Sequence, residues 1–175
     1  MSLPQGAWRI DPERSQVAFR VRHLGISSVR GRFTRFEGSL EVGTEALRVE
    51  GSVEVASVDT GDRKRDDFLR SAEFFDAERH PRLVFTCSSP APTRGDRHEV
   101  EGELTIGTVA RPLALLTEWE GPDGDGRLGV CARGELRRGD YGLRFPSVGG
   151  YGDALVGEKV MIRIDASAVR PGPVE

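Results

Sequence analysis

The chain has 175 residues, which is enough for one domain with a full hydrophobic core. A net charge of −3 argues against a general electrostatic attraction to nucleic acid. No apolar run approaches the roughly 20 residues of a membrane-spanning helix, and the first residues lack the basic and apolar regions of a signal peptide. We therefore expect a soluble, cytoplasmic protein.

Apolar and polar residues alternate with period two along most of the chain, which indicates strands with one apolar and one charged face. The predicted strands are Val17–Val21, Phe36–Val42, Leu47–Val55, Leu83–Cys87, Val100–Ile106, Leu113–Trp119, Leu128–Leu136 and Val160–Ala166. About eight such strands, joined by glycine-rich turns, predict an all-β sandwich or a closed barrel. A barrel of this size either packs solid or holds one small ligand.

The stretch "DTGDRKRDDFLRSAEFFD" interrupts this alternation and predicts a short helix. Asp62 can cap the helix through its carboxylate, and Asp66 and Arg70 are spaced to form a surface ion pair. Such a short helix must pack on another part of the fold, and a barrel mouth is the natural partner. Its apolar contacts would come from Phe68, Leu69, Phe74 and Phe75. The interleaved acids and bases could also be catalytic, but a solvated outer face of a hydrophobic lid is favoured.

The two cysteines are predicted to be free thiols, because Cys87 points into the predicted barrel and Cys131 points out of it. Free thiols suit a reducing compartment. Neither the cysteines nor the three histidines have the spacing of a metal site, so we expect no metal and no cofactor. His98 is placed in a polar loop. His23 ends a strand, and either a structural hydrogen bond or contact with a ligand's polar end fits it.

Residues 15–36 contain five arginines and no acidic residue. This basic hairpin could hold a phosphate or touch an anionic membrane surface. Arg20 and Arg22 alternate with core residues and point outward, which favours the simpler interpretation of an ordinary outer barrel face.

Several longer motifs resemble the YceI-like, polyisoprenoid-binding family, in order from Trp8 to about Ala168. They are "WRIDPERSQVAFRVRHLGISSVRGRFTRFEGSL", "SVDTGDRKRDDFLRSAEFFDAERHPRLVFTCSS", "VEGELTIGTVARPLALLTEW" and "RRGDYGL". The resemblance implies an extended, lipocalin-like antiparallel barrel of eight strands with a helical insertion. It also implies an apolar tunnel for an isoprenoid chain, such as a polyprenyl phosphate or a quinone tail, without catalysis. Phe68 stands where the family usually has histidine, which makes the lid more apolar.

The resulting domain prediction is a flexible N-terminus at residues 1–7, one barrel domain at 8–169 and a flexible tail at 170–175. Alternation and the resemblance together predict the tunnel lining: Phe19, Val21, Phe33, Phe36, Val53, Phe68, Phe74, Leu83, Phe85, Leu104, Leu115 and Val130. His23, Arg65 and Arg70 are the candidates for binding the head group. The expected partners are an isoprenoid lipid or quinone, a transient membrane surface and a second copy in a homodimer, with no nucleic acid.

Two alternatives remain open at this point. The protein could be an enzyme acting on a quinone or lipid, with Asp66, Asp67 or His23 as acid or base. It could also be a barrel packed solid that serves as an interaction module. Small residues at inward positions favour a cavity over a solid core: Gly51, Gly102, Ala132 and Gly134.

Overall fold

The computed structural model describes residues 2–23, 25–93, 95, 97–145 and 156–173. The strands are β1 Gly6–Ile10, β2 Gln16–His23, β3 Ser27–Phe33, β4 Phe36–Val42, β5 Ala46–Glu54, β6 Val58–Asp59, β7 Arg82–Pro90, β8 Arg97–Ile106, β9 Val109–Glu120, β10 Leu128–Arg137 and β11 Val156–Val169. In the described ranges the α-helix is α1, Arg63–Arg70, and the 3-10 turns are η1 Pro12–Arg14, η2 Val55–Ser57 and η3 Arg138–Tyr141. No helix in these ranges is long and apolar enough to cross a membrane.

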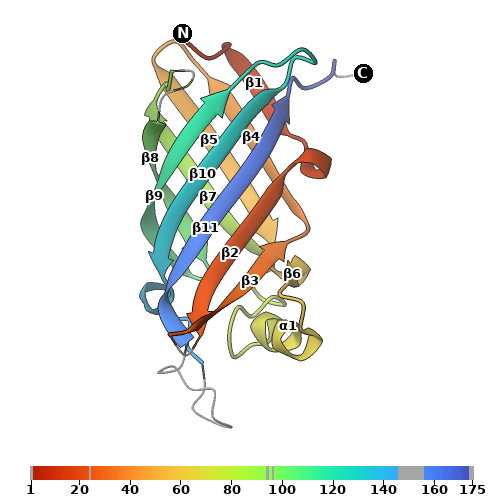
Figure 1. The fold of residues 1–175 in the computed structure, drawn as a ribbon, viewed down its shortest axis with the longest axis vertical. Helices are drawn as coiled ribbons and strands as arrows, with labels where there is room; N and C mark the ends of the chain where they lie inside the picture. Colours follow the sequence, from red (N-terminus) through yellow and green to blue (C-terminus); the bar gives the residue numbers. More distant parts are fainter. Residues whose placement is uncertain (1, 24, 94, 96, 146–155, 174–175) are drawn as a thin grey trace.

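The strands form a closed antiparallel barrel (Figure 1). Around the barrel the order is β1, β4, β5, β7, β8, β9, β10 and β11, and β11 pairs back to β1 to close it. These eight strands confirm the predicted fold class. β11 is long enough to extend past β1 and to pair with β2 over the rest of its length.

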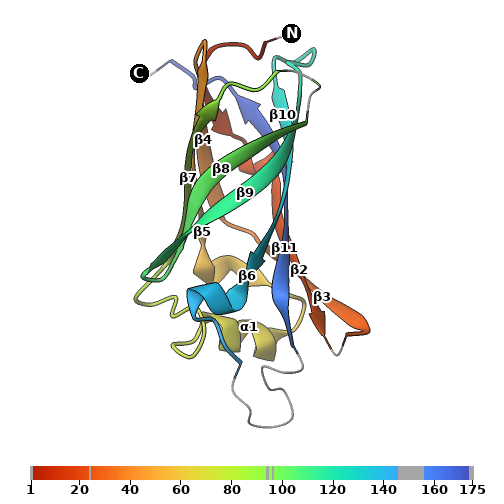
Figure 2. The ribbon, with the colours of Figure 1, turned by 90° about the vertical axis from the view of Figure 1, so that its left-hand side faces the viewer.

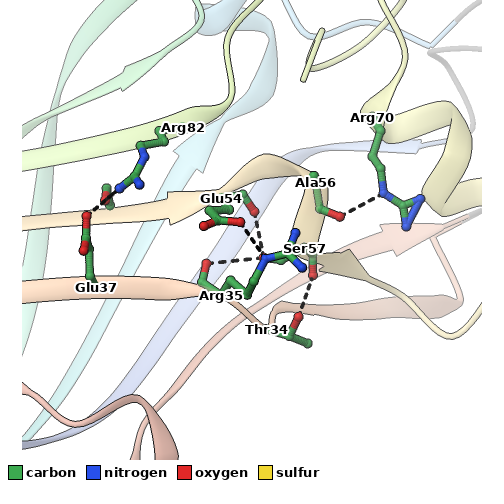
Figure 3. Close-up of polar contacts among 9 residues, drawn as sticks. Thr34, Arg35, Glu37, Glu54, Ala56, Ser57, Arg70 and Arg82 are labelled. Carbon is green, nitrogen blue, oxygen red and sulfur yellow. Dashed lines mark hydrogen bonds and ion pairs between the residues drawn. The ribbon is translucent and has the colours of Figure 1, made fainter. Parts of the chain in front are cut away.

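Two of the barrel's walls are broken strands. β1 and β2 lie end to end along β11, and η1 separates them because Pro12 cannot continue a β ladder. β4 and β3 continue each other in the same way, with Thr34 and Arg35 between them. There the backbone N–H and the hydroxyl of Thr34 both donate to the carbonyl of Ser57, and the hydroxyl of Ser57 donates to the carbonyl of Arg35 (Figure 3). The sequence pattern predicted the hairpin within residues 15–36, but neither β1 nor these breaks.

One end of the barrel is packed solid. Trp8, Leu47, Trp119 and Leu128 are almost completely buried there, in one cluster with Leu3. The N-terminal segment, expected to be flexible, thus places a buried leucine in the core and starts β1 at Gly6. In the expected tail, the Arg170 guanidinium lies 4.3 Å from the centre of the Trp8 ring.

The helix α1 covers the other end (Figure 2). Asp62 caps it as predicted: its carboxylate accepts the backbone N–H of Arg65 at 3.0 Å, and this hydrogen bond holds the pKa of Asp62 below its usual value. Leu69 is buried with Phe33 and Val58, so the apolar side of the helix packs on the barrel mouth. The predicted packing of the helix is confirmed.

Candidate ligand-binding site

A cavity of about 870 Å³ runs inside the barrel. Its wall consists mostly of the inward residues of the strands, because successive side chains of a strand point to opposite faces. Ligand pockets for small molecules fall between roughly 300 and 1,000 Å³, so this cavity is at the large end of that range. The barrel is therefore not packed solid, which argues against the interaction module with a filled core.

Every residue of the predicted lining borders this cavity. Phe19, Val21, Phe33, Phe36, Val53, Phe68, Phe74, Leu83, Phe85, Leu104, Leu115 and Val130 all lie on its wall. Leu104 and Leu115 are also buried members of the core. Contact with a ligand remains a prediction for each of the twelve.

The inward glycines have a different role from the predicted one. A Cβ at Gly102 would collide with the Phe85 ring, and one at Gly134 would lie 2.6 Å from Leu115. The space at these glycines is thus filled by neighbouring side chains and does not enlarge the cavity. Gly51 differs, since the nearest atom to its Cβ position is 3.8 Å away.

Aromatic rings close the cavity at the α1 end. The Phe68 ring lies 5.9 Å from Phe74 and 5.8 Å from Phe145, and Phe74 lies 4.9 Å from Phe145, measured between ring centres. Aromatic pairs at such separations add to the stability gained by burial. Phe145 was not predicted at the site, because its segment has no strand alternation.

The polar groups on the cavity wall that could meet a ligand's head group also lie at the α1 end. His23, Lys64 and Arg65 border the cavity there, and so does Asp62. Arg65 is held in place by Thr60: its Nε donates to the hydroxyl at 2.8 Å and its Nη2 to the backbone carbonyl at 2.9 Å. The site therefore joins a long apolar interior to a polar mouth, where Lys64 and Arg65 outnumber the Asp62 carboxylate.

Comparison with known proteins agrees with this architecture. A family model described as YceI-like domain matches residues 8–168, nearly the whole chain. The chain belongs to the YceI-like family. It is 34% identical over 134 residues to a UPF0312 protein of Pectobacterium atrosepticum, covering 73% of this chain and 69% of that protein. It is 32% identical over 146 residues to Protein YceI of Escherichia coli O157:H7, and the match covers 78% of this chain and 76% of that protein.

Solved structures show the same fold. Burkholderia cenocepacia BcnA aligns with a TM-score of 0.81 at 21% identity, over 91% of this chain and 99% of that one. A polyisoprenoid binding domain from Saccharophagus degradans aligns with a TM-score of 0.72 at 15% identity, over 94% and 98%.

Two predictions about the helix of this YceI-like barrel are wrong. Asp66 does not pair with Arg70 and is not solvated: it is buried, and its Oδ1 accepts the backbone N–H of Thr60 at 2.9 Å and the Thr60 hydroxyl at 2.6 Å. Arg70 pairs with Asp67 and donates its Nε–H to the carbonyl of Ala56 at 3.0 Å (Figure 3). Arg70 does not border the cavity, so the structure separates it from the other head-group candidates.

Arg138 is a site residue that sequence reasoning missed. It is 2% exposed and borders the cavity. Its guanidinium donates to the carbonyls of Leu143, Val156 and Gly157 at 2.9–3.0 Å and lies 5.1 Å from the centre of the Phe145 ring. These bonds join η3 to the start of β11. In "RRGDYGL" nothing distinguishes this arginine from the exposed one before it, so the sequence offered no signal.

The thiols and histidines add no reactive site to the YceI-like barrel. Cys87 and Cys131 are free, and burial raises the pKa of both thiols, which disfavours the reactive thiolate. His98 lies in β8 and not in the predicted loop, and its Nε2 is buried without a partner among the described residues. In the described part of the chain no three His, Cys, Asp or Glu residues are grouped to hold a metal ion.

Proposed function

We propose that the protein binds an amphiphilic isoprenoid lipid, tail inward, and carries, stores or senses it without chemical change. The observation that carries the proposal is the 870 Å³ apolar cavity with a packed core at one end and cations at the other. The similar domain from Saccharophagus degradans is described as polyisoprenoid binding, which supports the same ligand class here.

The length of the cavity matches a medium isoprenoid tail. On β11 its wall runs from Val156 to Ala166, which at about 3.3 Å per residue and a strand tilt near 40° gives roughly 25 Å along the barrel axis. An amino-acid residue contributes three backbone bonds to an extended chain and spans about 3.3–3.6 Å. An isoprene unit contributes four chain bonds and therefore spans about 4.5 Å. Five or six units therefore fill the tunnel when extended.

The mouth favours a phosphate head group over a quinone. Arg65 donates two of its nitrogens, Nε and Nη2, to Thr60. These bonds fix the guanidinium and leave Nη1 as the nitrogen that can donate to a head group. Lys64 next to it has no ion pair in the described part of the chain. These two cations outnumber the Asp62 carboxylate beside them, and a phosphate accepts charge-assisted hydrogen bonds from such groups. We expect Lys64→Gln with Arg65→Gln to weaken polyprenyl phosphate much more than a quinone of equal tail length.

We propose a binding role and not catalysis because the candidate acids are occupied elsewhere. Asp66 is bound to Thr60, and Asp67 is exposed and paired with Arg70. Quinone or lipid conversion that is lost in both Asp66→Asn and Asp67→Asn, each shown to be folded, would restore the enzyme hypothesis.

The decisive experiment is native mass spectrometry of the protein purified from its own host, followed by solvent extraction and identification of the released molecule. A stoichiometric prenyl lipid is expected. The Phe85→Arg variant should lose it, because a cation would replace a ring in the apolar wall, while exposed Arg63→Ala should retain it. A protein that stays without ligand even after addition of polyprenyl phosphates and quinones would refute the proposal. A cytoplasmic location, a homodimer and transient contact with a membrane stay predictions.

A further inference from the structure

One outer wall of the barrel, formed by β10, β11, β2 and β3, collects positive charge. We call it the basic face and define it by outward residues of these strands: Arg20, Arg22, Arg30, Arg32, Arg133, Arg137, Lys159 and Arg163. These cations outnumber the carboxylates on the same strands, which are Glu135, Glu158 and Asp165. The chain as a whole carries a net charge of −3, so its charges are unevenly distributed.

Strand register places cations of the basic face directly opposite each other. Arg20 faces Arg30 across β2 and β3, and Arg133 faces Arg163 across β10 and β11. Like charges in directly opposite positions destabilise a sheet. Elsewhere on the barrel the pairing is complementary, as in Glu41 opposite Arg48. Asp165 forms an ion pair with Arg163 and compensates the second opposition. The repulsion between Arg20 and Arg30 is therefore the one that a bound anion would relieve.

The arginines nearest the barrel mouth have no internal counter-charge. In the described ranges, Arg20, Arg22 and Arg30 are exposed and make no ion pair, whereas Arg32 reaches Asp59 at 3.6 Å. Counter-charge must come from solution or from a partner.

The hairpin of β2 and β3 adds an apolar tip to this charge. Ile26, between the two strands, is 94% exposed. Figure 2 shows the hairpin leaving the barrel at the α1 end, where the cavity has its polar groups. β3 pairs with β2 along its whole length but with β6 only at Arg32 and Phe33, so the rest of its second edge has no strand partner among the described residues. The inner side of the same hairpin lines the cavity through Val21 and Val29.

We propose that the basic face and Ile26 dock the protein on an anionic lipid bilayer, with the cavity mouth beside the membrane. Cations close to an anionic leaflet attract it, and an exposed isoleucine inserts among the acyl chains. A bilayer explains both features at once, whereas a soluble phosphate would account for the charge alone. The docking does not depend on which molecule occupies the cavity.

The test is flotation with vesicles that contain no isoprenoid, made either of phosphatidylcholine alone or with phosphatidylserine added. We expect binding to the anionic vesicles only, and release by about 0.5 M salt, because salt screens exposed charges. Arg20→Ser, Arg22→Ser and Arg30→Ser combined should weaken binding roughly 100-fold, at about five-fold per cation. Ile26→Ser should weaken it about ten-fold.

The matched control removes the same net charge from other walls, with Arg48→Ser, Arg82→Ser and Arg97→Ser combined, and should keep binding within about two-fold of wild type. Equal loss in both triple variants, equal binding to neutral vesicles, or no binding to either vesicle would overturn the proposal.

A salt-sensitive dimer that disappears only in the basic-face variant would assign this face to a second copy instead, and would also overturn it. Thermal melting verifies that the variants are folded. Phe85→Arg, expected to lose the cavity lipid, should still float with anionic vesicles, so this test is independent of the proposed function.

Discussion

The replacement Ala166→Trp tests whether an isoprenoid tail reaches the deep end of the cavity. Ala166 lies on β11 opposite Val130, points inward and borders the cavity on the side of the packed core. It is only partly buried, so the position borders open space. An indole there occupies the room that the last part of a full-length tail would need.

The expected cost follows from the apolar surface that the tail can no longer bury. One isoprene unit has five carbons, and at about 0.8 kcal/mol per buried carbon group its exclusion costs about 4 kcal/mol. This corresponds to a Kd nearly three powers of ten weaker for tails of six units or more. A tail of two units leaves the deep end free, and its affinity should be unchanged.

The assay is titration with polyprenyl phosphates of two tail lengths, followed by native mass spectrometry, with Tm as the check on folding. Ala114→Trp is the matched control, because Ala114 is exposed on the outer side of β9. The reasoning would be refuted if Ala166→Trp, folded as wild type, bound the long tail equally well. If the variant bound the short and the long tail equally weakly, the short tail would also occupy the deep end of the tunnel, which contradicts a head group held at the mouth.

Three further predictions concern the fold that supports the cavity. Gly102→Ala should destabilise the barrel by about 1–3 kcal/mol in urea denaturation, because its methyl group would lie 2.6 Å from a strand carbonyl and overlap an aromatic ring. Asp66→Ala should cost about 1–3 kcal/mol by the same measurement, because it leaves two partly buried donors of Thr60 without their acceptor; unchanged stability would contradict this role of Asp66. The hydrogen bond from Arg127 holds the pKa of Asp11 below its ordinary value of 3.8, so the pair stabilises the fold above that pH and ceases to do so as the pH falls through the lower, folded-state pKa. Asp11→Asn should therefore lower Tm at about pH 7 and approach wild type in strong acid, and a difference that persists in acid would contradict the linkage.

Side-chain alternation predicted the inner face of the barrel because it is a local property. On a strand, the direction of a side chain follows from its parity alone, so residues such as Phe19 and Leu83 could be assigned to the interior without knowledge of their neighbours. Glycine was the exception. An inward glycine indicates missing volume, but only the structure shows that Phe85 fills it at Gly102.

The helix α1 shows the same contrast between features set by nearby residues and features set by the tertiary structure. Its capping by Asp62 was predictable, since the cap binds a backbone N–H three residues away. The partner of Asp66 was not predictable, because Thr60, which precedes the helix, offers it two donors, while Arg70 binds Asp67 and the carbonyl of Ala56. Burial then reversed the expectation that this carboxylate is solvated.

The sequence by itself determined that the chain consists of amphipathic strands around an apolar interior, with a capped lid helix, because periodicity and capping act within a few residues; the choice of a barrel over a sandwich came from the family resemblance. Tertiary structure alone decided the features that depend on strand register. These are the closure of β1 onto β11, the burial of Arg138 among three carbonyls and the opposition of Arg20 to Arg30. Each of the three joins separate segments of the chain, and their alignment follows from the packing of the whole barrel.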